Sequence, residues 1–185
     1  MVQMNDTYIT NTKIDGLLVI ERPTFSDERG FFHEVVRFDD LLKVTGTDFY
    51  PVQINHSLSL PNVIRALHME GWNKLVYPVG KMFAAIVDVR PESKTFGKIE
   101  TFQFEETKHR ALFIPKGLAN SICNNGAWPL NYIYFVDSYY DGKDTKAIAW
   151  NDPYLNINWP IKNPIISERD RHNPTMKELF PDKFK

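Results

Sequence analysis

Short segments with strand-like alternation, separated by turn residues, constrain this chain more than any other feature. The clearest covers residues 81–90 (KMFAAIVDVR), where apolar side chains recur at every second position. One face of this segment carries Phe83, Ala85, Val87 and Val89, and the other carries Ala84, Ile86, Asp88 and Arg90. A period of two indicates a β-strand.

Similar segments recur about every ten residues, with turn residues between them. We predict further strands at residues 16–22, 31–38, 63–69, 99–105, 111–114 and 131–138, and turns at 27–30, 59–62, 115–117 and 141–144. Only residues 39–45 and 175–180 have helix-like spacing. A parallel α/β fold needs more helices than that, so we predict a single all-β domain over residues 1–185. Its architecture is expected to be a double-stranded β-helix (jelly roll) with a few short helices.

Charge and composition argue against several functions. The formal net charge is −1, and no basic stripe is present that would bind a nucleic acid polymer. No apolar run approaches the length of a membrane span. The single cysteine, Cys123, cannot form an internal disulfide, and residues 1–13 lack the apolar core of a secretion signal. We therefore expect a cytoplasmic protein that binds neither nucleic acid polymers nor membranes.

The spacing of candidate ligands argues against a metal site. The five histidines are His33, His56, His68, His109 and His172. They form no H-x-H or H-E-x-x-H pair, and one cysteine cannot build a structural zinc site. We predict no metal ion.

The segment after residue 63 gathers three groups able to do chemistry. Arg65, His68 and Lys74 lie on and just after a mainly apolar strand. They could form a rim of solvated charges, or a pocket with an anion clamp, a base and an electrophile. Because Arg65 and His68 are an odd number of positions apart, a regular strand would point them to opposite faces. Both can line one pocket only if the strand bends or bulges, or if Arg65 lies near its end.

Two later segments are weaker signals by themselves. Residues 132–140 hold four tyrosines, and Tyr132 and Tyr134 would share one face of a strand. Most tyrosines in β proteins fill the core or cover the sheet surface. Residues 164–171 could equally be a solvated cluster of charges.

Short motifs over almost the whole chain, taken in order, carry a more specific signal. They are FSDERGFF (25–32) with Glu34, VQINHS (52–57), RALH (65–68), KLV (74–76), TFG (95–97), FIPKGLA (113–119), Tyr134 with Tyr139 and Tyr140, WNDP (150–153), INWP (157–160) and ISERD (166–170). In this order they resemble the dTDP-4-dehydrorhamnose 3,5-epimerase family. The resemblance implies a cupin-type jelly roll that needs no cofactor. It also implies a homodimer that exchanges an amino-terminal strand.

The resemblance further implies a role for particular residues. His68 is similar to the family's base, Asp170 to its dyad partner, Tyr134 to the acid on the opposite sugar face, and Lys74 to the group facing the 4-keto oxygen. The implied substrate-binding residues are Arg29, Glu34, Gln53, Asn55, Arg65, Asn120, Tyr140 and Arg169. Strand exchange would place Arg29 in the neighbouring subunit's site. The implied reaction converts dTDP-4-dehydro-6-deoxy-D-glucose into dTDP-4-dehydro-L-rhamnose by proton abstraction at C3 and C5.

Some positions depart from the family pattern and keep alternatives open. The usual Arg-Gly-Leu-His-Tyr-Gln is replaced by a segment that ends in Met69 and Glu70, and a usual pocket histidine is replaced by Asn120. An acidic residue that often follows the tyrosine strand has Asp144 as its nearest match. The alternatives are a mono-epimerase acting at C3 or C5 of a related 4-keto nucleotide sugar, a 3,4-ketoisomerase, and a non-catalytic cupin that binds sugar nucleotides.

Overall fold

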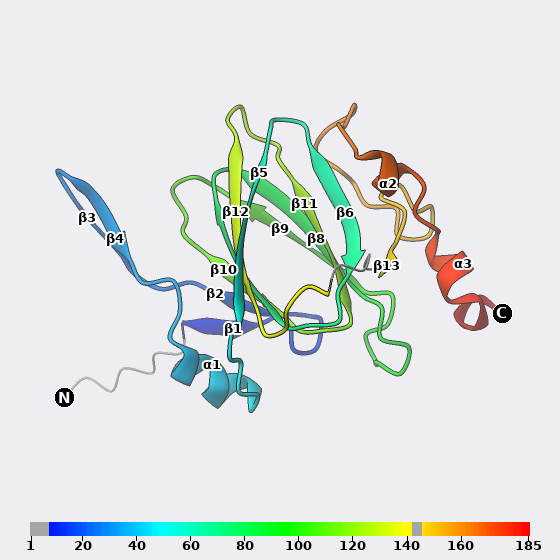
Figure 1. Cartoon of the computed structure of the whole chain (residues 1–185), viewed down its shortest axis with the longest axis horizontal. Coiled ribbons are helices and arrows are strands. Elements are labelled where there is room, and N and C mark those ends of the chain that lie inside the picture. The colour runs from blue at the N-terminus through cyan, green and yellow to red at the C-terminus, as the bar shows by residue number, and fades with distance from the viewer. Residues whose placement is uncertain (1–7, 142–145) are drawn as a thin grey trace.

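Two antiparallel sheets face each other in this computed structural model, which describes residues 8–141 and 146–185 (Figure 1). The six-stranded sheet has the order β1 (Ile9–Asn11), β2 (Leu18–Ile20), β10 (Ala111–Ile114), β7 (Lys74–Val79), β12 (Leu130–Val136), β5 (Gln53–Ser59). The five-stranded sheet has the order β13 (Lys146–Ala147), β6 (Ile64–Met69), β11 (Leu118–Cys123), β8 (Met82–Asp88), β9 (Ile99–Phe104). The all-β jelly-roll prediction is confirmed.

The core follows from the alternation along the strands. As predicted for residues 81–90, Ala84 and Ile86 of β8 face the opposite sheet, whereas Phe83 and Val87 pack outward against the C-terminal segment. Both faces of this strand are buried, which accounts for its nearly continuous apolar sequence. Helix α1 (Phe38–Thr45) packs on the outer face of the six-stranded sheet through its buried Leu41.

Short helices close the outer faces of the barrel. They are α1 (Phe38–Thr45), α2 (Glu168–Arg171), α3 (Met176–Leu179) and the 3-10 helix η1 (Pro181–Phe184). The helices predicted at 39–45 and 175–180 are therefore confirmed, and Thr175 and Glu178 form a capping box at the start of α3. None of the helices among the described residues has the length and apolar character to cross a membrane.

Strands β3 (Thr24–Asp27) and β4 (Gly30–His33) form a two-stranded hairpin that projects from the barrel (Figure 1). Its aromatic side chains Phe25, Phe31 and Phe32 are 58–67% exposed. The predicted strand over residues 31–38 is wrong beyond residue 33. The chain leaves the hairpin there, Glu34 pairs with Arg37, and α1 begins at Phe38.

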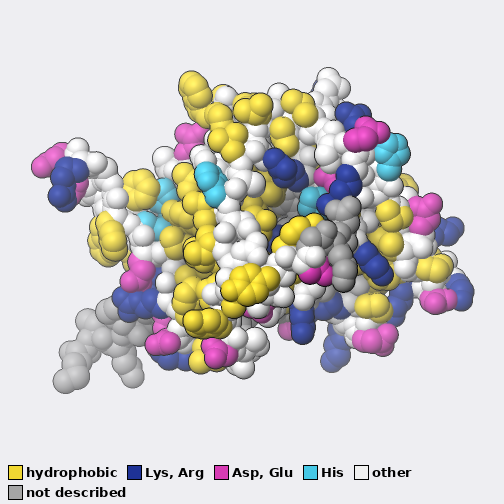
Figure 2. All heavy atoms as spheres, viewed as in Figure 1, with side chains coloured by type: hydrophobic (Ala, Val, Ile, Leu, Met, Phe, Trp, Pro, Cys, Tyr) yellow, Lys and Arg dark blue, Asp and Glu magenta, His cyan; other side chains and the backbone are white. Residues whose placement is uncertain are grey.

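Edge strand β5 reverses the usual alternation of a sheet. Its inward side chains Gln53, Asn55 and Ser57 are polar and line cavities, whereas the outward Ile54 and Leu58 are 65% and 49% exposed. Figure 2 shows hydrophobic side chains gathered in a band down the face of the molecule where β5 lies. The polar inner face marks a pocket between the sheets, and the apolar outer face is typical of a contact surface.

Several elements escape prediction for identifiable reasons. Strands β5, β7 and β11 are not among the predicted strands. No helix is predicted at α2, because the sequence of that segment could equally be a solvated cluster of charges. In β7, Pro78 interrupts the alternating sequence pattern. The proline is tolerated because β10 pairs only with Lys74 to Val76, so the side of Pro78 that faces β10 has no strand partner. The turn predicted at residues 141–144 lies mostly outside the described residues, as does Asp144.

Asp88, at the end of β8, is fully buried and ties down the loop that follows it. Its carboxylate accepts hydrogen bonds from Arg90, Ser93 and Thr95 at 2.5–2.9 Å. Burial alone would raise the pKa of Asp88, but these hydrogen bonds outweigh it and lower the pKa from 3.8 to about 2. A carboxyl group with a depressed pKa in the folded state stabilises the fold above its unfolded pKa, and this contribution disappears as the pH falls from about 4 to 2.

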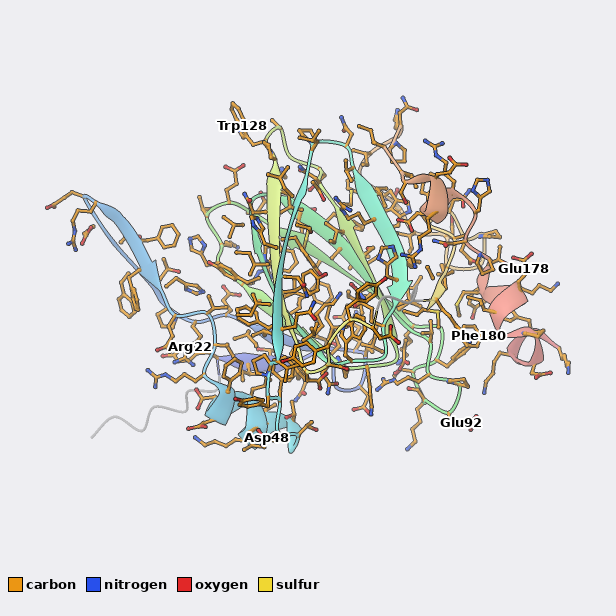
Figure 3. All side chains as sticks on the ribbon, in the orientation of Figure 1. Arg22, Asp48, Glu92, Trp128, Glu178 and Phe180 are labelled. Atoms are coloured by element: carbon orange, nitrogen blue, oxygen red, sulfur yellow. The ribbon has the colours of Figure 1, made fainter. Side chains whose placement is uncertain are left out.

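We expect Asp88→Asn to lower the free energy of unfolding by about 2 kcal/mol at pH 7. Urea unfolding of both proteins between pH 7 and pH 2 tests this, and the difference should shrink below pH 4. Glu92→Gln, an exposed carboxylate on the same loop (Figure 3), is the matched control. A difference that stays constant down to pH 2 would contradict this account of Asp88.

Candidate active site

Polar side chains from both sheets meet at one end of the barrel, where two adjoining cavities open. The inner cavity, about 150 Å³, is lined by Ser57, Arg65, His68, Glu70, Lys74, Asn120, Ile122, Tyr132 and Tyr134. The outer cavity, about 240 Å³, is lined by Gln53, Asn55, His68, Glu70, Trp72, Tyr134, Val136, Tyr140 and Arg169. His68, Glu70 and Tyr134 belong to both cavities and therefore lie where the two join.

A bulge in β6 lets Arg65 and His68 face the same cavity. Arg65 lies opposite Ile122 of β11 and His68 opposite Asn120, so three steps along β6 match two along β11. The intervening Ala66 and Leu67 are both fully buried. A bulge of this kind re-aims side chains and is common beside active sites. The geometric condition set out from the sequence is thus met by a bulge.

His68 and Asp170 are joined by a hydrogen bond of 3.0 Å between Nε2 and Oδ1, although 102 positions separate them in sequence. Asp170 is 3% exposed and lies on α2, where Ser167 caps the helix by accepting a hydrogen bond from the Asp170 amide. Its carboxylate also accepts hydrogen bonds from Asn173 Nδ2 and the Ala66 amide. Because His68 bonds Asp170 through Nε2, the ring's Nδ1 is the nitrogen left for a reactant.

The charge state of Asp170 suits a partner of a base. Burial raises the pKa of this carboxyl group, but the hydrogen bonds and charge of His68, together with Asn173 and the Ala66 amide, outweigh burial and lower the pKa below its ordinary value. Asp170 is therefore an anion at neutral pH. An anion in that position fixes the orientation of the imidazole and stabilises the imidazolium that forms when His68 takes up a proton.

Lys74 lies at the start of β7 with its side chain 4% exposed, and it forms an ion pair with Glu70. Its Nζ also donates to Asn120 Oδ1 at 3.3 Å. Burial lowers the pKa of Lys74, and the charge and hydrogen bond of Glu70 offset part of that effect.

Tyr134 lies beside Lys74 on the inner face of β12. The Lys74 Nζ is 4.6 Å from the centre of the Tyr134 ring, an arrangement typical of a cation–π contact. Burial and the negative charge of Glu70 raise the pKa of Tyr134. Its hydroxyl therefore carries a proton at neutral pH, as a proton donor requires.

Most of the residues expected to bind substrate line one of the two cavities. In the outer cavity, Gln53 donates to Asn55 at 2.7 Å and accepts from the Tyr140 amide at 3.1 Å. In the inner cavity, Arg65 donates to Ser59 Oγ and the Leu58 carbonyl oxygen. Arg169 lines the outer cavity and Asn120 the inner one.

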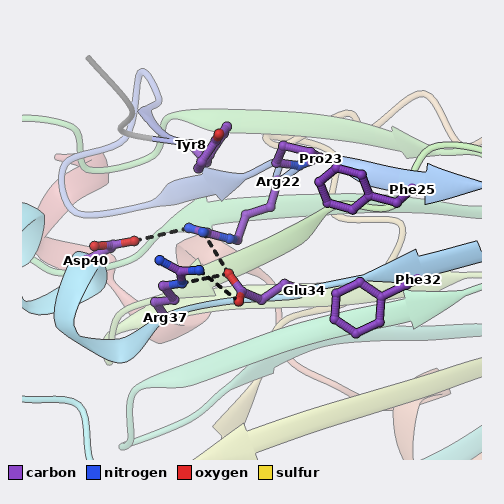
Figure 4. A pocket seen from close by; sticks show the side chains of 8 residues that line it. All are labelled: Tyr8, Arg22, Pro23, Phe25, Phe32, Glu34, Arg37 and Asp40. Carbon is purple, nitrogen blue, oxygen red and sulfur yellow. Dashed lines mark hydrogen bonds and ion pairs between the residues drawn. The ribbon is translucent and has the colours of Figure 1, made fainter. Parts of the chain in front are cut away.

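Arg29 and Glu34 lie elsewhere. Arg29 is at the tip of the projecting hairpin, paired with Asp27. Glu34 lies at the hairpin's base, between Arg22 and Arg37, in a separate pocket of about 370 Å³ that Asp40 also lines (Figure 4). Within one chain, neither residue lines the cavities around His68.

Sequence reasoning misses several pocket residues. Glu70 stands out in the sequence only as a departure from the family pattern, and Trp72 and Ser57 are not among the predicted site residues. Asn173, which holds Asp170, belongs to no motif and follows α2 by two positions. Within residues 8–141 and 146–185, no group of three or more His, Cys, Asp or Glu side chains is placed to hold a metal ion.

A jelly-roll barrel whose mouth holds a His–Asp pair, a buried lysine and a protonated tyrosine defines a cupin-type enzyme that moves protons. The sequence model of dTDP-4-dehydrorhamnose 3,5-epimerase matches residues 11–178. The chain belongs to the dTDP-4-dehydrorhamnose 3,5-epimerase family and is an isomerase.

Individual relatives agree with this assignment. The chain is 34% identical to the dTDP-4-dehydrorhamnose 3,5-epimerase of Shigella flexneri, over 88% of this chain and 92% of that protein. A crystal structure of the Legionella pneumophila epimerase, in complex with dTDP-4-keto-L-rhamnose, has a TM-score of 0.86 at 31% identity and covers 94% of this chain and 95% of that one. ChmJ, a 3'-monoepimerase from Streptomyces bikiniensis in complex with dTDP-quinovose, has a TM-score of 0.84 at 28% identity and covers 92% and 89%.

Proposed function

We propose that this enzyme epimerises dTDP-4-dehydro-6-deoxy-D-glucose at C3 and C5, giving dTDP-4-dehydro-L-rhamnose. The observation that carries the proposal is the His68–Asp170 hydrogen bond at a cavity that also contains Lys74 and Tyr134. A protein that only bound the nucleotide sugar would have no need of a base, its orienting anion, a buried cation and an acid around one space. The Legionella relative with dTDP-4-keto-L-rhamnose supports the choice of substrate.

The chemistry assigns each residue a task. Hydrogens at C3 and C5 are acidic because the C4 carbonyl can accept the charge as an enolate. His68 removes such a proton, and general-base catalysis of this kind supplies about 10²–10⁴-fold in rate. The Lys74 ammonium stabilises the negative charge that develops on O4. Tyr134 then protonates the carbon from the opposite face, and the configuration inverts.

The outer cavity suits the rest of the substrate. Gln53, Asn55 and Tyr140 bring amide groups and an aromatic ring, and Arg169 brings a positive charge. Arg65 supplies a second guanidinium beside the inner cavity, and guanidinium groups are well suited to bind phosphate oxygens. Because His68, Lys74 and Tyr134 line the inner cavity, the sugar would occupy that cavity, and the diphosphate and nucleotide base would extend outward.

A mono-epimerase is the second candidate, and one observation favours it. Asn120 stands where the family usually has a pocket histidine, and it is committed to hydrogen bonds with Lys74, Glu70 and the His68 carbonyl oxygen. A neutral amide held in this way cannot serve as a second base. The similarity to ChmJ, described as a 3'-monoepimerase, adds weight to this reading.

The active assembly that we propose is a cytoplasmic homodimer that exchanges an amino-terminal strand. The apolar outer face of β5 and the exposed aromatic side chains of β3 and β4 are the surfaces that a second copy would cover. Exchange would carry Arg29 to the pocket of the other chain. The cytoplasmic location is consistent with Cys123, a buried free thiol in a chain that needs no oxidising compartment.

Stereochemistry tests the proposed roles. We expect His68→Ala to abolish both deuterium uptake from D₂O and inversion, because no enolate forms. Tyr134→Phe removes only the hydroxyl, so the enolate still forms and His68 returns a solvent deuteron to the face it came from. The result should be deuterium uptake with inversion slowed by about 10²–10⁴-fold at the affected carbon, measured by proton NMR of the product.

Tyr154→Phe is the control, because this tyrosine packs against Phe184 of the C-terminal segment and lines neither cavity. It should leave exchange and inversion coupled. Inversion by Tyr134→Phe at the parent rate would show that another group is the acid.

The dimer is tested by placing charge on the apolar face of β5. We expect Ile54→Glu together with Leu58→Glu to convert a dimer into a monomer in analytical ultracentrifugation, because both charges would be buried without partners in the interface. Tyr154→Glu, 57% exposed beside the C-terminal segment, is the control and should remain dimeric. A parent protein that sediments as a monomer would contradict the proposed assembly.

A further inference from the structure

Glu70 follows β6 directly and forms a closed group with Lys74 and Asn120. The carboxylate pairs with the Lys74 ammonium and accepts a 3.0 Å hydrogen bond from Asn120 Nδ2, while Asn120 Oδ1 accepts from Lys74. The Glu70 and Lys74 side chains are 12% and 4% exposed, and Asn120 is 5% exposed. Two buried polar side chains and the largely buried Glu70 thus satisfy one another at the wall of the inner cavity.

The surroundings of Lys74 give this carboxylate a specific task. Arg65 and His68 approach from β6, Tyr132 and Tyr134 from β12, the neutral Asn120 from β11, and Ile114 pairs with Lys74 from β10. Among the residues lining the inner cavity, Glu70 is the only carboxylate. Burial favours a neutral lysine, and the charge and hydrogen bond of Glu70 oppose it.

We propose that Glu70 is a positioning residue, the counter-ion that keeps Lys74 charged and, held by Asn120, directs its ammonium across the face of Tyr134. The mechanistic value of this arrangement rests on the proposed function, because a charged Lys74 matters where an enolate forms. The ion pair between Glu70 and Lys74 does not depend on that function, because it follows from the positions of the two side chains. Glutamine would keep the shape and remove the charge, so Glu70→Gln isolates the electrostatic contribution.

The direction of the effect follows from the signs. Glu70 raises the pKa of Lys74 and burial lowers it. Loss of the carboxylate should therefore lower the pKa of Lys74 further, and the alkaline limb of kcat against pH should move to lower pH with it. At pH values above the limb, kcat should fall about tenfold for each pH unit that the limb moves, and near pH 6 it should stay within a few-fold of the parent.

The first experiment measures kcat from pH 5.5 to 9.5 for the parent, Glu70→Gln and Glu70→Asp, the last of which should lie between the other two. Glu105→Gln is the control, because Glu105 pairs with the partly exposed Lys81 at 3.8 Å, away from the cavities, and should leave the profile unchanged. A loss of kcat that is equal at every pH would mean that Glu70 has only a structural role, and would overturn the proposal.

The second experiment needs no turnover. The ε-carbons of ¹³C-labelled lysines are titrated by NMR, and the Lys74 signal is assigned by its absence in Lys74→Arg. A lower titration midpoint in Glu70→Gln supports the proposal, and an unchanged midpoint overturns it. If the parent takes no deuterium into the sugar while the midpoint still falls, the proposed function fails and the role of Glu70 stands. If Glu70→Gln does not fold, Glu70→Asp is titrated in its place, and a midpoint equal to the parent's overturns the proposal.

Discussion

The hydrogen bond between His68 and Asp170 depends on three separate parts of the fold being in place. The bulge in β6 turns His68 toward the cavity, α2 holds the aspartate from the other side, and Asn173 fixes the carboxylate between them. Because Asp170 is buried and anionic, each of its hydrogen bonds offsets part of the cost of removing a charge from water. The C-terminal segment therefore holds the His68 ring in place as well as covering the sheet.

The same barrel contains an apolar core and a polar mouth, and the difference comes from which side chains the strands turn inward. Most inner positions of β8 are apolar, whereas those of β5 are polar and its apolar residues face outward. Several polar groups in the mouth satisfy one another, as Lys74, Glu70 and Asn120 do. A network of this kind holds its members in fixed positions, so little reorganisation is needed when charge moves during a reaction.

Alternation is enough to predict the fold class and the two-faced burial of residues 81–90. It fails at β5, where the inner face is polar, and at residues 34–37, where ion pairs end the strand. The sequence alone marks Arg65, His68 and Lys74 as a possible pocket. The pairing of His68 with Asp170 could be found only through resemblance, because the two residues lie 102 positions apart and no local pattern links them. The role of Glu70 could not be predicted at all, since a carboxylate after a strand looks like any solvated charge until its neighbours are known.

Deuterium uptake at C3 and C5, followed by NMR with dTDP-4-dehydro-6-deoxy-D-glucose in D₂O, tests most directly whether the His68–Asp170 pair creates the enolate. The account predicts uptake with inversion in the parent, and uptake slowed by about 10²–10⁴-fold in Asp170→Asn. Glu168→Gln, whose side chain on the same helix is 84% exposed, should match the parent. Parent-like uptake in Asp170→Asn, or no uptake at either carbon in the parent, would contradict the account.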